Sequence, residues 1–85
     1  MHMTQATHDT NGHLLKRWTV QLRGHAELTV TASTRYRAIG DAYAQLGLTA
    51  PKFRLRPRPT APGWYIVSSH RSPRILGQIA RKDAP

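Results

Sequence analysis

The sequence predicts an α+β fold in which a small antiparallel sheet, in the order ββαββ, packs on one helix and is followed by a short C-terminal helix or strand. Three observations support this prediction. Several segments alternate apolar and polar residues as strands do, one segment repeats apolar residues as a helix does, and glycine or proline separates the segments. Residues 1–12 are polar and show neither period, so we expect a flexible tail there and a single domain over residues 13–85.

The first two strands are expected between residues 14 and 32, as a hairpin with one buried face. Apolar side chains occupy alternate positions on both sides of a glycine, namely Trp18, Val20, Leu22, Leu28, Val30 and Ala32. Because directly opposed residues of a hairpin share a face, the loop must hold an odd number of residues. We expect a Gly24-His25-Ala26 loop, which places Arg23 opposite Glu27 as a weak surface ion pair.

A helix is expected after this hairpin, capped by Ser33 or Thr34. Gly47 is expected to end the helix. Apolar residues recur at the three-and-four spacing of one helical face, namely Ala38, Ile39, Ala42, Tyr43 and Leu46. Arg35 and Arg37 lie in the first turn, where the helix dipole mildly disfavours cations. Such a placement is compatible with a use elsewhere, although an ordinary solvated helix face explains it as well.

The stretch PKFRLRPRP, residues 51–59, places a basic residue at every second position. On a strand, Lys52, Arg54, Arg56 and Arg58 share one face, while Phe53 and Leu55 take the other. Prolines 57 and 59 donate no backbone hydrogen bond, so this strand is expected at an edge of the sheet. One interpretation is a row of phosphate contacts; the alternative is that charge and proline protect an edge strand from aggregation.

Another strand is expected over residues 64–70, in WYIVSSH. Its apolar residues occupy both faces, which is typical of a central strand or of one with an exposed aromatic, and Trp64 and Tyr65 must face opposite ways. The last segment favours a helix capped by Ser72 with Pro73 at its first position. Gly77 weakens that helix by roughly 1 kcal/mol relative to alanine, so a fifth strand is the alternative.

Composition limits the function. Thirteen Lys and Arg stand against four Asp and Glu, for a formal charge of +9 and a pI of about 11.5. Nucleic acid is the commonest partner for such a balance, while a bias toward arginine in a GC-rich genome is the alternative explanation. No cysteine is present, and no apolar run has the length of a signal peptide or of a membrane helix, so we expect a cytoplasmic protein without a membrane partner.

Catalytic and metal motifs are missing from the sequence. The four acids are scattered as Asp9, Glu27, Asp41 and Asp83, and no nucleophile elbow, phosphate-binding glycine loop or metalloprotease motif occurs. The five histidines, His2, His8, His13, His25 and His70, show no spacing that suits a metal. We therefore expect no enzyme, no cofactor and no metal.

The main hypothesis is a small basic, arginine-rich protein that binds DNA or RNA through phosphate contacts on the edge strand. Its candidate binding residues are Lys52, Arg54, Arg56, Arg58, Arg71, Arg74, Arg81 and Lys82, with Tyr65 as a stacking platform. The alternative is a protein-interaction module, of the kind encoded by phages or plasmids, that docks on an acidic host protein by strand addition. The same edge strand could also pair two copies into a homodimer.

Overall fold

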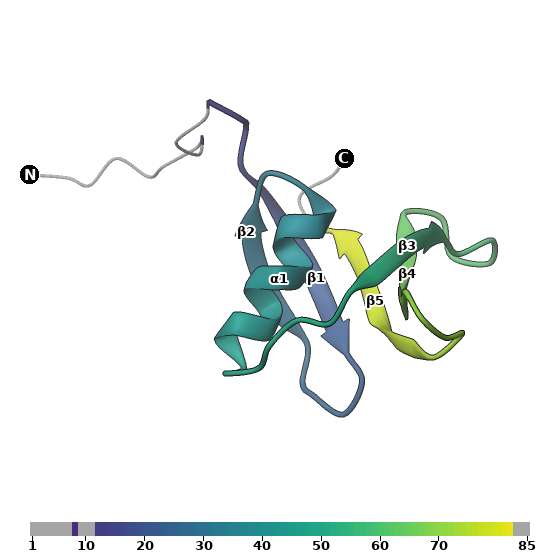
Figure 1. The fold of residues 1–85 in the computed structure, drawn as a ribbon. Helices are drawn as coiled ribbons and strands as arrows, with labels where there is room; N and C mark the ends of the chain where they lie inside the picture. The colour runs from purple at the N-terminus through teal and green to yellow at the C-terminus, as the bar shows by residue number, and fades with distance from the viewer. Residues whose placement is uncertain (1–7, 9–11, 83–85) are drawn as a thin grey trace, which may run out of the picture.

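The computed structural model describes residue 8 and residues 12–82, which form a five-stranded antiparallel sheet with one helix on one face (Figure 1). The strands are β1 (Lys16–Leu22), β2 (Leu28–Ala32), β3 (Phe53–Pro57), β4 (Trp64–Ser69) and β5 (Ile75–Arg81), and the helix is α1 (Arg35–Gln45). The predicted α+β class and antiparallel sheet are confirmed. The tail expected over residues 1–12 lies outside the described residues, apart from His8, which bridges to Leu14, and Gly12.

The element order is ββαβββ, because the C-terminal segment is a strand and not a helix. This strand, β5, lies at the centre of the sheet, whose spatial order is β2-β1-β5-β4-β3. It therefore joins the hairpin of β1 and β2 to the hairpin of β3 and β4 (Figure 1). The predicted position of the arginine-rich strand is confirmed, since β3 is an edge strand.

The loop between β1 and β2 is odd, as expected, but it is displaced by one residue. Val20 pairs with Leu28, and continuing this register sets Leu22 opposite Ala26 and Gln21 opposite Glu27. The expected pair of Arg23 and Glu27 is therefore wrong. Gln21 Nε2 instead donates a hydrogen bond of 2.9 Å to Glu27 Oε2.

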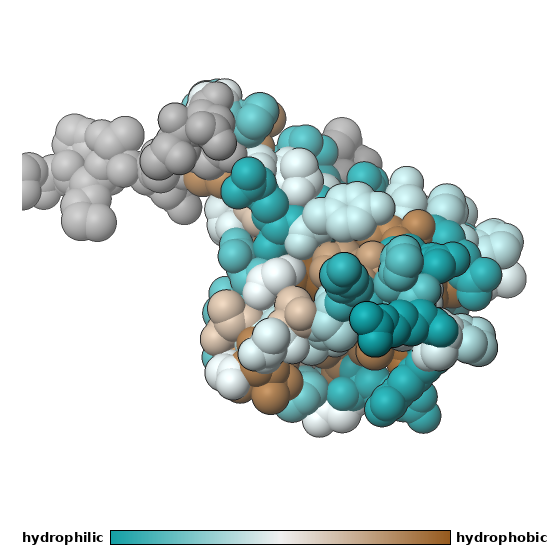
Figure 2. All heavy atoms as spheres, viewed as in Figure 1, coloured by the Kyte–Doolittle hydropathy of each residue, from teal (hydrophilic) through white to brown (hydrophobic). Residues whose placement is uncertain are grey.

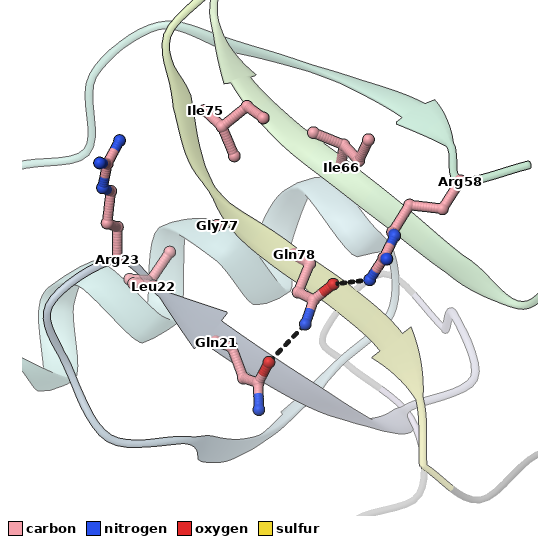
Figure 3. A pocket seen from close by; sticks show the side chains of 8 residues that line it. All are labelled: Gln21, Leu22, Arg23, Arg58, Ile66, Ile75, Gly77 and Gln78. Carbon is pink, nitrogen blue, oxygen red and sulfur yellow. Dashed lines mark hydrogen bonds between the residues drawn. The ribbon is translucent and has the colours of Figure 1, made fainter. Parts of the chain in front are cut away.

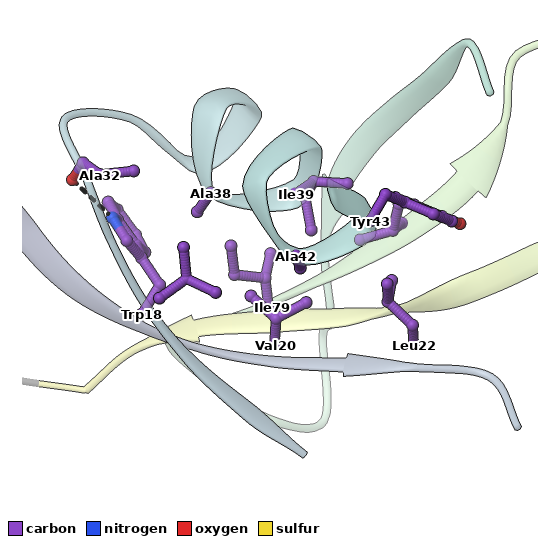
Figure 4. Packing of buried hydrophobic residues seen from close by; sticks show 11 residues of the cluster. Trp18, Val20, Leu22, Ala32, Ala38, Ile39, Ala42, Tyr43 and Ile79 are labelled. Atoms are coloured by element: carbon purple, nitrogen blue, oxygen red, sulfur yellow. Dashed lines mark hydrogen bonds between the residues drawn. The ribbon is translucent and has the colours of Figure 1, made fainter. Parts of the chain in front are cut away.

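The helix begins as predicted at Thr34, whose side chain accepts a hydrogen bond from the Arg37 backbone N–H at 3.2 Å. After its last turn Gly47 takes a φ of 72°, the left-handed conformation in which glycine carries no steric penalty. The apolar stripe of α1 packs on β1 and β2 and closes a core that reaches β4 and β5 (Figure 4). Its fully buried larger members are Val20, Val30, Ile39, Val67 and Ile79.

Trp18 closes one end of this core with 2% of its surface exposed. Its indole Nε1–H donates to the backbone oxygen of Ala32 on β2 at 2.9 Å (Figure 4). The only polar atom of the side chain is thereby satisfied, so the large ring is buried without leaving a polar group unpaired.

Close packing explains why β5 contains a glycine. Gly77 pairs with Leu22 of β1, and a Cβ built on it would stand 2.1 Å from the backbone oxygen of Gln21. No side chain fits there, so glycine marks a close backbone approach and not a break in a helix. Just before it, a bulge opposite Val67 and Ser68 leaves Leu76 packed against the core.

The helix side of the molecule is mixed in character. Figure 2 shows hydrophilic residues gathered where β3 and β4 lie, and hydrophobic ones near the C-terminal end of α1. Within residues 12–82, no helix has the length and apolar character that crossing a membrane requires.

Candidate functional site

Among the described residues, no helix covers one face of the sheet, because α1 packs on the other. The pairing register assigns each strand residue to a face. The uncovered side, called the open face from here on, carries Arg54, Arg56, Trp64, Ile66, Ser68, Gln78, Ala80, Arg17, Thr19, Gln21, Thr29 and Thr31. The sequence around β3 predicted its cations, but not that the open face extends over all five strands.

The alternation of β3 is as predicted. Arg54 and Arg56 are exposed on the open face, while Phe53 and Leu55 are half-buried against the core. The Phe53 ring stacks on Tyr36 of α1, with ring centroids 5.7 Å apart, and this contact fixes the start of β3 on the helix. The side chain of Arg56 makes no hydrogen bond or ion pair with any described residue, so its guanidinium is available to a ligand.

Three arginines and three serines surround a hollow of about 430 Å³ between β3 and the loop that joins β4 to β5. This serine hollow is lined by Arg54, Arg56 and Arg71, by Ser68, Ser69 and Ser72, and by His70 and Pro73. It carries no acid. Guanidinium and hydroxyl groups are donors that suit phosphate oxygens, so the hollow has the chemistry of an anion site.

Local hydrogen bonds shape the loop of the serine hollow. Ser69 Oγ accepts from the backbone N–H of Arg71, and Ser72 Oγ accepts from that of Arg74, both at 3.3 Å. Arg54 Nη2 donates to the backbone oxygen of His70 at 2.9 Å, which orients one edge of its guanidinium and ties β3 to the loop. Arg71 is thereby brought beside the β3 arginines, with which the sequence hypothesis grouped it.

A chain of side chains crosses the open face (Figure 3). Arg58 Nη1 donates to Gln78 Oε1, Gln78 Nε2 donates to Gln21 Oε1, and Gln21 donates in turn to Glu27. A cation at one end and a carboxylate at the other align the two amides in one direction. The neighbouring hollow, of about 530 Å³, is bordered by Ile66 and Ile75, and Arg58 is held at its side rather than left free.

The two adjacent aromatics of β4 face opposite ways, as predicted. Tyr65 was the expected stacking platform. It pairs with the buried Ile79, and Val67, which shares its face, pairs with Gly77, so Tyr65 lies on the helix side of the sheet. There the Arg35 guanidinium lies 4.1 Å from the centroid of the Tyr65 ring. Trp64 pairs with Ala80 instead and lies half-buried on the open face, among the cations.

The remaining predicted residues divide between the two sides. Lys82 lies on the open face, where its Nζ donates to Thr29 Oγ1 at 3.0 Å. Arg81 pairs with Trp18 on the helix side. The side chain of Arg74 lies beside Tyr43 of α1 and does not line the serine hollow. Lys52 is exposed at the start of β3, and its backbone oxygen accepts from the His70 N–H at 3.0 Å.

Burial raises the pKa of the Tyr43 hydroxyl above its ordinary value of 10.0, and the nearby charge of Arg74 partly opposes that rise. This tyrosine belongs to the core and lies on the side of the sheet away from the open face. Its titration therefore reports on packing and not on the candidate site.

Within the part of the chain that the structure describes, no three histidine, cysteine or acidic side chains gather where a metal could bind. Only two acids, Glu27 and Asp41, occur among these residues, against all thirteen lysines and arginines. Family models, curated proteins and solved structures were compared with this chain, and none of them matches it. The candidate site is therefore argued from its own geometry.

Proposed function

We propose that this chain binds single-stranded nucleic acid across the open face of its sheet and performs no catalysis. The observation that carries the proposal is that the open face combines a row of cations and a tryptophan, and that Glu27 at its far corner is the single acid there among the described residues. A basic sheet with an aromatic platform is the physical recipe for binding single strands, in which phosphates and unstacked bases are both accessible.

Phosphate contacts come from the serine hollow and its rim. Arg54 and Arg56 stand about 6.6 Å apart on one strand face, so they engage separate phosphates. Arg71 approaches from the loop on the other side of the same hollow. Each guanidinium offers a planar fork of donors to two phosphate oxygens, which an ammonium group does not.

Base contacts come from β4. Trp64 and Ile66 lie on the open face between the β3 arginines and the glutamines of the β5 and β1 strands. A base stacked on Trp64 gains energy whatever its identity, because every base has an aromatic face. The amides of Gln21 and Gln78 are already paired to each other, so little hydrogen-bonding capacity remains for reading base edges.

A fluorescence anisotropy titration tests the proposal. Labelled single-stranded and duplex oligonucleotides are titrated with the protein at about 50 and about 200 mM salt, the range over which phosphate contacts lose most affinity. We expect log K to fall linearly with log salt and the single strand to bind more tightly than the duplex. No binding at the lower salt concentration would contradict the proposal.

A second candidate function follows from the outer edge of β3, which pairs with β4 on one side only. A partner's strand added to this edge would make backbone hydrogen bonds, as in the protein-interaction and homodimer hypotheses. Pro57 shortens the usable edge to its first residues. Strand addition depends on backbone groups, so it should survive loss of Arg54 and Arg56, whereas nucleic-acid binding should not.

A further inference from the structure

A second basic hollow lies on the opposite side of the sheet, where α1 begins. It has a volume of about 280 Å³ and is bordered by β1, β3, β4 and the first residues of the helix. Its polar lining comes from Lys16, Ser33, Thr34, Arg35, Tyr36 and Tyr65. Neither of the two described acids lines it, so no described side chain of the opposite charge balances Lys16 and Arg35 within the hollow.

Two buried polar atoms at this hollow have no hydrogen-bond partner. Ser33 is 5% exposed and its Oγ is unpaired, and the Nε of the half-buried Arg35 is unpaired as well. Buried polar atoms in folded proteins are nearly always bonded, and those that are not call for an explanation. Both groups carry a hydrogen that they can donate, and both residues line this hollow, so an acceptor is what each of them lacks.

Two aromatic rings lie against the Arg35 guanidinium. Its central carbon lies 4.1 Å from the centroid of the Tyr65 ring and 5.3 Å from that of Trp18. These cation–π contacts hold the guanidinium in place, and its N–H groups remain as donors for another partner. Nε–H and a neighbouring Nη–H form a fork that matches two oxygens of one phosphate.

The start of the helix adds to the positive electrostatic potential in the hollow. The first N–H groups of a helix have no acceptor within it, and their dipoles favour an anion. The Thr34 hydroxyl already caps the Arg37 N–H, and the first turn of α1 contains no acid. Arg35 and Arg37 lie in this first turn, where the helix dipole repels their positive charges. A bound anion would offset that repulsion.

We propose that this hollow binds a phosphate group, as inorganic phosphate or as a phosphate monoester. The fork of Arg35 and the hydroxyl of Ser33 donate to its oxygens, and Lys16 supplies further charge. The ammonium group of Lys16 makes no hydrogen bond or ion pair with the residues described. Because the hollow lies on the helix side, this site is separate from the open face and does not depend on the proposed function.

The test is an NMR titration of the isotope-labelled full chain with inorganic phosphate and with glycerol phosphate at constant ionic strength. We expect saturable shifts of the Arg35 Nε–H and of the Ser33 and Thr34 amides. Arg35→Lys keeps the charge but removes the fork, so it should weaken binding roughly tenfold. The matched control Arg37→Lys, an exposed arginine of the same helical turn that does not line the hollow, should leave affinity within about twofold.

Ser33→Ala provides a second variant that retains every charge and should also weaken binding. Tighter binding of glycerol phosphate than of inorganic phosphate would identify the ligand as an ester, and tighter binding of inorganic phosphate would identify free phosphate. The proposal is overturned if Arg35→Lys and Arg37→Lys have equal effects. It is also overturned if phosphate shifts only resonances around the serine hollow on the other side of the sheet.

Discussion

Replacing Arg54 and Arg56 with glutamine should change how nucleic-acid binding depends on salt. Both side chains are exposed on the open face, so the double variant should fold normally. At a spacing of about 6.6 Å they meet separate phosphates, and each contact contributes about 0.7 to the slope of log K against log salt on single strands. The variant should therefore lose about 1.4 from this slope.

This loss of slope predicts how the variant compares with the wild type at different salt concentrations. Between about 50 and about 200 mM salt, the ratio of wild-type to variant affinity should shrink roughly sevenfold. The control is Arg37→Gln with Arg74→Gln, which removes the same charge from α1 and from the side of Tyr43. Anisotropy titrations measure both slopes, and equal slopes for the two double variants would refute the assignment of phosphate contacts to β3.

Three further predictions concern packing and stacking. Gly77→Ala should lower the free energy of unfolding by about 1–3 kcal/mol in denaturant titrations, because its Cβ would collide with the Gln21 backbone. In contrast, Gly40→Ala should raise the free energy of unfolding by up to about 1 kcal/mol, because a Cβ on this helical residue would lie in open space. Trp64→Ala should weaken single-strand binding by about 1–3 kcal/mol with an unchanged salt slope; a changed slope would contradict a stacking role. Because Tyr43 holds its proton more tightly when folded, the free energy of unfolding should fall as pH rises above about 10, and Tyr43→Phe should reduce that fall.

Local patterns were sufficient to predict most elements of the fold. The alternation around Trp18 and Val20, the spacing of Ile39 and Tyr43, and the stop at Gly47 follow from side-chain period and backbone preference, which depend on near neighbours. The conformation of the last segment depends on distant residues. Gly77 weakens a helix and also permits a close strand contact, and only its pairing with Leu22, far back in the chain, decides between them.

The candidate site was predictable in part for the same reason. The shared face of Arg54 and Arg56 is a local property of one strand. Which of Trp64 and Tyr65 joins that face depends on the register of β4 with both of its neighbours, so the expectation chose the tyrosine while the structure places the tryptophan there. Arg71 joins the site through a loop whose course no local pattern describes.

The two tryptophans allow the most direct test of the central claim that nucleic acid binds the open face. Trp64 lies on that face, and Trp18 is buried on the helix side with its indole N–H bonded to Ala32. The measurement is a titration of the ¹⁵N-labelled protein with a single-stranded oligonucleotide, following the two indole N–H resonances. The account predicts a large, saturable shift for Trp64 and almost none for Trp18; a shift of Trp18 alone, or of neither, would contradict it.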